Sequence, residues 1–207
     1  VNVVTCATDN EKAYRLFNSA ESKNIKVTNI GEGVVWRGTD MSGPGGGQKI
    51  NLIKKYIKTL PDTDILIFVD GYDVFFTDSI EQIIDRWHSF GTRILFGAEK
   101  TCWPDTSIAD KFPDQPTLYK YLNSGTFIAE VGELKNFLEG SIEDYEDDQL
   151  FMQQRFLLNK FDVKLDSEQY IFQTYDECVK REGVQLYNPE TRCYGCIFHG
   201  NGGLEAK

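Results

Sequence analysis

The chain has 207 residues, of which 41% are hydrophobic and 13% aromatic, and its formal net charge is −10. This length and composition predict an ordered globular protein with one substantial core and a single domain. No apolar run approaches the roughly 18 residues that cross a bilayer, and nucleic acid is an unsuitable partner because phosphate-backbone binding needs a basic surface. An anionic substrate would need a cation between it and the protein.

The five cysteines are too few and too scattered to build a disulfide framework. Cys193 and Cys196 have C-x-x-C spacing, but a structural zinc site would need a second pair at similar spacing. In an oxidising compartment Cys178 could pair with either of them, so the redox state stays open. The chain opens directly into a predicted strand with no signal peptide, which predicts a cytosolic protein or an excised piece of a longer one.

The predicted elements alternate between strand and helix in the first hundred residues and are less regular afterwards. Asp9 or Asn10 is the expected cap of the first helix, and Asp78 or Ser79 that of the third. An alternating pattern is typical of an α/β fold with a mostly parallel central sheet and helices on both faces. Strands are predicted at 1–8, 26–30, 65–69, 93–98, 122–128, 163–165, 171–173, 184–186 and 196–199, and helices at about 9–22, 48–60, 79–90, 132–138 and 149–158.

Two carboxylates, Asp70 and Asp73, come directly after the strand at 65–69. That strand is apolar throughout, as strands buried on both faces are. Ligands of open α/β sheets gather beyond the carboxyl ends of such strands, where this pair could hold one hard divalent cation. The alternative is a turn, since Asp-Gly is a common turn dipeptide and Asp73 could cap the next segment of the chain. These residues alone do not decide between the two.

A long irregular segment at 31–47 carries Trp36 and a cluster of glycines. It matches neither the P-loop pattern nor G-x-G-x-x-G. The segment is either an exposed loop or a binding loop in which Trp36 is buried or stacks on a flat ligand. Lys49 follows in the first turn of the next helix, where a cation is unfavourable unless an anion lies nearby.

Eight segments, in order, resemble the glycosyltransferase domain of the collagen lysyl hydroxylases. They are VVTCATDNE, VVWRGTD, GGGQK, FVDGYDV, ILFGAEKTCWP, LNSGTFI, DDQLF and IFHGNG. The resemblance covers residues 3–202 and implies a GT-A fold, a Rossmann-like α/β sandwich that binds a nucleotide-sugar and Mn²⁺. None of the segments belongs to the hydroxylase half of that family, so no iron or 2-oxoglutarate chemistry is expected.

The resemblance implies that Asp70, Asp73 and His199 are the metal ligands. Mn²⁺ accepts mixed oxygen and imidazole ligands and neutralises charge on a departing UDP. A lone histidine is otherwise usually a hydrogen-bonded core residue, but the glycines at 200 and 202 would let the backbone approach a phosphate closely.

Further donor contacts are implied by position in the matching segments. Met41 stands where the family has a smaller aliphatic residue, and ordinary core packing is the alternative for Trp36, Tyr72 and Trp103. The implied contacts are Cys6 and Thr8 to the uridine, Trp36 to the base and ribose, Lys49 to the diphosphate, Tyr72 stacked on the uracil, and Gly200, Asn201 and Gly202 to the phosphates.

The acidic run at 143–148 matches an aspartate run of the family only at its end. Glu143, Asp144 and Glu146 are expected on a solvated face. Asp147 and Asp148 are the implied catalytic residues, which would orient the acceptor hydroxyl or stabilise positive charge at the anomeric carbon. The acceptor side would be shaped by Glu99, Trp103 and Asn123.

The reaction predicted from this resemblance is Mn²⁺-dependent transfer of glucose from UDP-glucose onto galactosyl-hydroxylysine of collagen-like chains, with retention. The alternative is transfer of galactose from UDP-galactose onto hydroxylysine, an inverting reaction that needs a general base such as Asp148. A silent binding domain would lack metal ligands, and a phosphohydrolase would need more ligands for two metals. The family implies a collagen partner and the endoplasmic reticulum lumen, with homo-oligomerisation left open.

Overall fold

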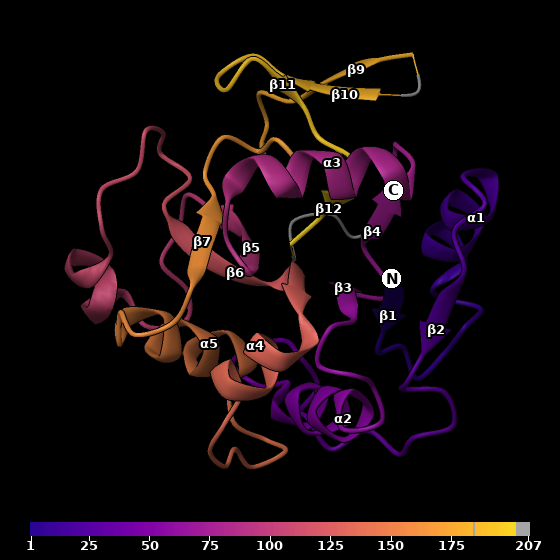
Figure 1. Cartoon of the computed structure of the whole chain (residues 1–207), viewed down its shortest axis with the longest axis vertical. Helices are drawn as coiled ribbons and strands as arrows, with labels where there is room; N and C mark the ends of the chain where they lie inside the picture. The colour runs from indigo at the N-terminus through magenta and orange to yellow at the C-terminus, as the bar shows by residue number, and fades with distance from the viewer. Residues whose placement is uncertain (184, 202–207) are drawn as a thin grey trace.

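A six-stranded mixed sheet forms the centre of the molecule (Figure 1). The computed structural model describes residues 1–183 and 185–201. The strand order is β2-β1-β3-β6-β5-β7, which confirms the expected α/β class with a central sheet. The strands are β1 (Asn2–Thr5), β2 (Val27–Asn29), β3 (Ile65–Val69), β5 (Ile94–Glu99), β6 (Tyr121–Glu130) and β7 (Val163–Asp166).

One strand, β6, runs opposite to the others. It pairs antiparallel with both β3 and β5, whereas β1, β2, β3 and the β5–β7 pair are parallel. Because β6 begins at the edge where β3 and β5 end, Glu99 lies opposite Tyr121 and Val69 lies opposite Thr126. The first residues of β6 therefore lie at the same edge of the sheet as Asp70 and Asp73, which follow β3.

Helices cover both faces of this sheet (Figure 1). Side chains alternate along β3, so Leu66 and Phe68 pack on one face and Ile67 and Val69 on the other. The first face is covered by α2 (Gly47–Ile57), α4 (Val131–Phe137) and α5 (Asp148–Leu157), and the second by α1 (Tyr14–Ser22) and α3 (Ile80–Phe90). Among the described residues no helix is long and apolar enough to cross a membrane.

Two small sheets and a short helix complete the described structure. In the first small sheet β12 (Ile197–His199) lies between β4 (Val74–Phe76) and β8 (Phe172–Thr174). The second, at the top of Figure 1, joins β9 (Lys180–Glu182), β10 (Gln185–Asn188) and β11 (Cys193–Tyr194). The 3₁₀ helix η1 spans Thr106–Lys111. The sequence did not predict β4, β9, β11 or η1, because elements this short carry no periodic pattern.

The N-terminal cap of α3 is the one that the sequence predicted, and that of α1 is not. Ser79 accepts a hydrogen bond from the Gln82 amide and caps α3, as expected. The prediction for α1 was wrong: the helix begins at Tyr14 without a side-chain cap. The Asp9 carboxylate instead accepts bonds from the amides of residues 11 and 12 and closes a separate turn before the helix. The structure pairs none of the five cysteines.

The fully buried Asp166 holds the chain between β7 and β8. Its carboxylate accepts hydrogen bonds from the amides of Tyr170, Ile171 and Phe172 at 2.7–2.8 Å. These bonds fix the start of β8, which pairs with β12 and so supports His199. Asp166 thus stabilises the region from which a predicted site residue comes.

Asp166→Ala is expected to lower the free energy of unfolding by about 3–5 kcal/mol, because it leaves the buried amides of Ile171 and Phe172 and the partly buried amide of Tyr170 without an acceptor. Urea denaturation at neutral pH measures the change. Asp114→Ala, at an exposed position, is the control and should cost less than about 0.5 kcal/mol. Equal losses in the two variants would contradict this role of Asp166.

Burial raises the pKa of Asp166 from 3.8 to about 6, even though the three amide bonds favour its charged form. The folded state therefore binds this proton more tightly than the unfolded state does. We expect the stability of the wild type relative to Asp166→Asn to fall as pH rises from about 4 to about 6 and to stay constant above that. The midpoints of urea denaturation of the two proteins, measured across this pH range, test the prediction. A difference between the midpoints that does not change with pH would contradict it.

Candidate active site

The turn after β3 carries Asp70 and Asp73 and is held by backbone bonds to two other strands. The Asp70 amide donates to the Gly125 carbonyl in β6, and the Gly200 amide, just after β12, donates to the Asp73 carbonyl, both at 2.8 Å. The carboxylates are therefore positioned by paired strands and not by a free loop. This placement suits a site that must hold its geometry.

His199 comes from the far end of the chain and faces both carboxylates. Its Nε2 lies 3.6 Å from Asp70 Oδ2 and 3.4 Å from Asp73 Oδ2. Ligands at right angles around a cation with bonds of about 2.1 Å are about 3.0 Å apart, so these three atoms need only a small contraction to hold one ion. Two carboxylates and an imidazole form a donor set that suits Mn²⁺. The residues present fit a divalent cation.

Gly125 leaves the space that this ion would fill. A Cβ built at Gly125 would lie 2.2 Å from His199 Cε1 and 2.6 Å from Asp70 Oδ2. Any side chain there would enter the cradle between the ligands. Sequence reasoning missed Gly125, although a glycine inside a predicted strand signals a close approach by another group.

The buried Lys49 lies between two of the carboxylates. Its Nζ is 3.0 Å from Asp70 Oδ1 and 2.5 Å from Asp148 Oδ2. Burial by itself would lower the pKa of Lys49, but Asp148 and Asp70 outweigh it and raise that pKa. Burial also acts to lower the pKa of His199, and the facing Asp73 and Asp70 carboxylates raise it. A cation in the first turn of a helix is favourable only beside an anion, and for Lys49 the carboxylates of Asp70 and Asp148 are those anions.

The acidic run holds the start of α2 through its backbone. The amides of Gly47 and Gln48 donate to the carbonyls of Glu146 and Asp144. Asp147 caps α5 by accepting from the Leu150 amide at 2.6 Å, and its other oxygen accepts from the Gly45 amide at 3.1 Å. The side chains of Glu143 and Glu146 are exposed, as expected, while the backbone of the run closes the loop at 31–47 onto α5.

Asp144 departs from the solvated role expected of it. Its carboxylate pairs with Arg37 and accepts a hydrogen bond from Asn51. These contacts tie the acidic run to the loop at 31–47 and to α2.

A cavity of about 850 Å³ brings most of the predicted residues together. Thr8 and Gly200 do not line it, and Gly202 lies outside the described residues. Thr8 lies behind Tyr72, whose hydroxyl accepts bonds from the amides of Thr8 and Asp9. The predicted residues that line the cavity are Cys6, Trp36, Met41, Lys49, Asp70, Tyr72, Asp73, Glu99, Trp103, Asn123, Asp147, Asp148, His199 and Asn201.

Two further cavity residues were missed by sequence reasoning. Ser124 donates its hydroxyl proton to Asp148 Oδ2 at 2.9 Å, and the Gln149 side chain accepts from the Ser124 amide at 3.1 Å. Both are buried polar residues that lie beside the predicted Asn123 and Asp148. Single polar residues in a strand or helix give no periodic signal, and only the packing of α5 on β6 shows their place.

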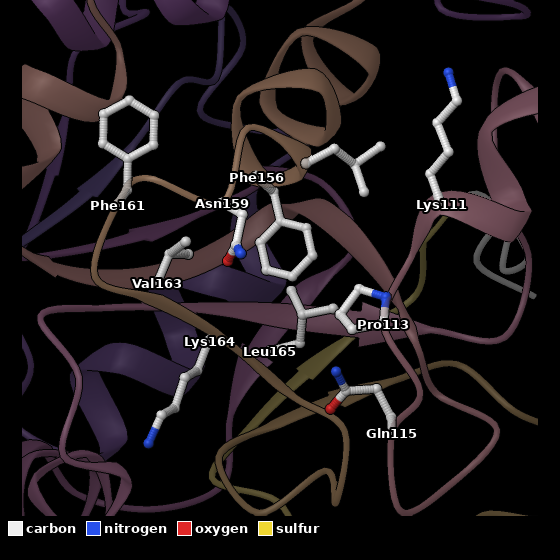
Figure 2. Close-up of a pocket in the computed structure, with 10 residues that line it drawn as sticks. Lys111, Pro113, Gln115, Phe156, Asn159, Phe161, Val163, Lys164 and Leu165 are labelled. Atoms are coloured by element: carbon white, nitrogen blue, oxygen red, sulfur yellow. The ribbon is translucent and has the colours of Figure 1, made fainter.

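A second, smaller cavity lies between α5, β7 and the segment after η1 (Figure 2). Its volume is about 370 Å³, and its lining includes Phe156, Leu165 and Pro113. Lys111 and Lys164 extend away from this apolar centre in Figure 2. With no carboxylate or histidine in its lining, it offers a cation no strong ligand. The candidate active site is therefore the larger cavity.

Comparison with known families shows where this chain belongs. A family model described as the PLOD GT domain matches residues 1–207. This chain belongs to the PLOD GT domain family. The resemblance predicted from the eight segments is thereby confirmed.

Relatives of the family are much longer than this chain. A procollagen-lysine,2-oxoglutarate 5-dioxygenase of Drosophila melanogaster is 37% identical over 98% of the chain and 30% of the relative. The human multifunctional procollagen lysine hydroxylase and glycosyltransferase LH3 is 34% identical over 97% of the chain and 29% of the relative. The chain thus spans about 30% of the length of these relatives.

Solved structures show the same fold at low sequence identity. Mouse xyloside xylosyltransferase 1 matches with a TM-score of 0.61 and 13% identity, over 100% of this chain and 99% of that one. The fold of this PLOD GT domain is that of the GT-A glycosyltransferases, as the sequence predicted.

Gly125→Ala is expected to weaken Mn²⁺ binding by about 100-fold or more, because its methyl group would occupy the cradle between Asp70 and His199. Isothermal titration of the metal-free protein with Mn²⁺ measures the affinity, and circular dichroism checks the fold. Gly43→Ala is the matched control, since Gly43 lines the same cavity with nothing within 4 Å of its added Cβ. If a folded Gly125→Ala protein bound Mn²⁺ with unchanged affinity, the cation could not bind between Asp70 and His199.

Proposed function

We propose that this chain is a single GT-A domain that transfers glucose from UDP-glucose onto galactosyl-hydroxylysine of collagen or a collagen-like protein, with Mn²⁺ as cofactor and with retention. The observation that carries the proposal is the cluster of Asp70, Asp73 and His199, whose ligand atoms lie within 4.8 Å of one another at the wall of the large cavity. Family membership supplies the substrate class.

The donor end of the cavity contains groups suited to a uridine diphosphate. Tyr72 is 44% exposed, and its hydroxyl is anchored on the amides of Thr8 and Asp9, which holds a flat ring in place for the uracil. The cation of Lys49 would meet the diphosphate, and Trp36 and Cys6 line the same hollow. Mn²⁺ held by Asp70, Asp73 and His199 would neutralise the charge that develops on the departing diphosphate.

The surroundings of Asp148 favour retention over inversion. Its Oδ2 contacts both the Lys49 ammonium and the Ser124 hydroxyl, and the residue is 4% exposed. Two donors thus already occupy Asp148 Oδ2, which leaves this oxygen less available to take a proton from an acceptor hydroxyl. The carboxylate is well suited to stabilise positive charge at the anomeric carbon. This supports glucose transfer by front-face substitution over a galactose transfer that uses Asp148 as a base.

The collagen acceptor and the place of action are further parts of the proposal. Glu99, Trp103 and Asn123 line the cavity together and form the proposed acceptor side. The family relation supports the lumen of the endoplasmic reticulum as the compartment. The complete set of three candidate metal ligands speaks against a silent binding domain.

The test is release of UDP from UDP-glucose and from UDP-galactose, with Mn²⁺, with and without a galactosyl-hydroxylysine or hydroxylysine peptide. We expect turnover of UDP-glucose stimulated by the galactosyl peptide, and a loss of more than about 100-fold in Asp73→Ala because a metal ligand is removed. Asp85→Ala, at an exposed position of α3, should retain activity. Use of UDP-galactose alone, on the bare hydroxylysine peptide, would establish the alternative reaction. No turnover of either donor would refute transferase activity.

A further inference from the structure

The carboxylate of Glu99 is bound by amides and not by a cation. Its Oε1 accepts hydrogen bonds from Asn123 Nδ2 at 3.2 Å and Gln149 Nε2 at 2.8 Å, and its Oε2 accepts one from Asn201 Nδ2 at 3.1 Å. Within the described part of the chain no lysine, arginine or histidine forms an ion pair with it. A carboxylate offers about four acceptor positions. Glu99 therefore keeps one for a donor that enters the cavity it lines.

Gln149 connects this carboxylate to two other parts of the cavity wall. Its Nε2 also donates to the Trp103 carbonyl at 2.9 Å, and its Oε1 accepts from the Ser124 amide at 3.1 Å. One side chain thus joins the end of β5, the segment that carries Trp103, and the start of β6. Gln149 is 7% exposed, so these bonds are made in a site with little competing water.

The bond to the Trp103 carbonyl matters because it holds the backbone of a residue that is 48% exposed. An exposed aromatic face beside a carboxylate with a free acceptor position is the arrangement that binds a sugar ring, by contact with the ring face and by a hydrogen bond to a hydroxyl. Gln149 touches neither Asp70, Asp73 nor His199 in any described hydrogen bond. Its other hydrogen bonds are on the acceptor side, apart from those that its Oε1 accepts from the amide and, at 3.5 Å, from the hydroxyl of Ser124.

We propose that Gln149 is a positioning residue for acceptor binding. Gln149 holds the Glu99 carboxylate and the Trp103 backbone in one hydrogen-bonded unit. It thereby sets the distance between the carboxylate that accepts a hydrogen bond from a sugar hydroxyl and the aromatic ring that contacts the face of the same sugar. This inference rests on the proposed function for the identity of that sugar. The hydrogen-bonded unit itself can be tested without it.

The test compares Gln149→Met with Gln153→Met, which removes an amide from the same helix one turn later. Gln153 is also buried, and its Nε2 donates to the Leu122 carbonyl of β6 and not to Glu99 or Trp103. Methionine has nearly the shape of glutamine but makes none of these bonds. With UDP-glucose and the galactosyl peptide, we expect Gln149→Met to raise the acceptor KM by about tenfold or more, since two donated bonds are lost, one of them to a charged group. Its donor KM and acceptor-independent UDP release should stay within about twofold of the wild type.

A spectroscopic readout separates this role from general loss of stability. In protein labelled with 5-fluorotryptophan, the ¹⁹F resonance of Trp103, assigned with Trp103→Phe, should shift or broaden in Gln149→Met. The resonance of Trp87, which is buried in the core on the opposite face of the sheet from α5, should not change, and Gln153→Met should leave both unchanged. If Gln149→Met does not fold, Gln149→Asn replaces it, because its amide keeps the polarity of the site but is one methylene too short to keep both donated bonds.

The outcomes separate the two proposals. If the wild type shows no acceptor-stimulated turnover, the proposed function fails, and the Trp103 resonance still decides whether Gln149 positions that residue. An unmoved Trp103 resonance overturns the positioning role. Equal rises in donor and acceptor KM, or equal effects of the Gln149 and Gln153 substitutions, also overturn it.

Discussion

The buried ammonium of Lys49, set between Asp70 and Asp148, is the interaction on which the active-site cavity depends. Five carboxylates, those of Asp70, Asp73, Glu99, Asp147 and Asp148, line one hollow, and removing that many charges from water is costly without a close counter-charge. Lys49 supplies it at 3.0 and 2.5 Å. Its place in the first turn of α2, unfavourable for a cation in an isolated helix, is explained by these two anions.

This charge arrangement requires a rigid scaffold, and the scaffold comes from strand pairing. β6 runs antiparallel beside β3 and brings Gly125 against Asp70, while β12 pairs with β4 and brings His199 against Asp73. Groups from three distant segments are therefore held by backbone hydrogen bonds. Side chains fixed in this way lose little further freedom when a ligand binds, which favours both affinity and catalysis.

The cavity has two chemically different sides. Around Lys49, Asp70, Asp73 and His199 the interactions are between charges, as a metal and a diphosphate require. Around Glu99 the interactions are hydrogen bonds from neutral amides, beside the exposed ring of Trp103. Such a surface suits an uncharged, hydroxyl-rich sugar. Asp148 lies where the two sides meet. Its carboxylate contacts Lys49 on the charged side, and the next residue in the chain, Gln149, donates to Glu99 on the other side.

Sequence by itself determined the strand at Ile65–Val69, the α/β class and the carboxylates Asp70 and Asp73 at the sheet edge, because burial and turn formation leave local patterns in the chain. Motif order identified the family. Local pattern could not reveal that β6 runs antiparallel, that Gly125 lets His199 and Asp70 come close to β6, or that Gln149 reaches Glu99. Those facts depend on contacts between residues far apart in the chain, and only the tertiary structure decides which distant polar groups become neighbours.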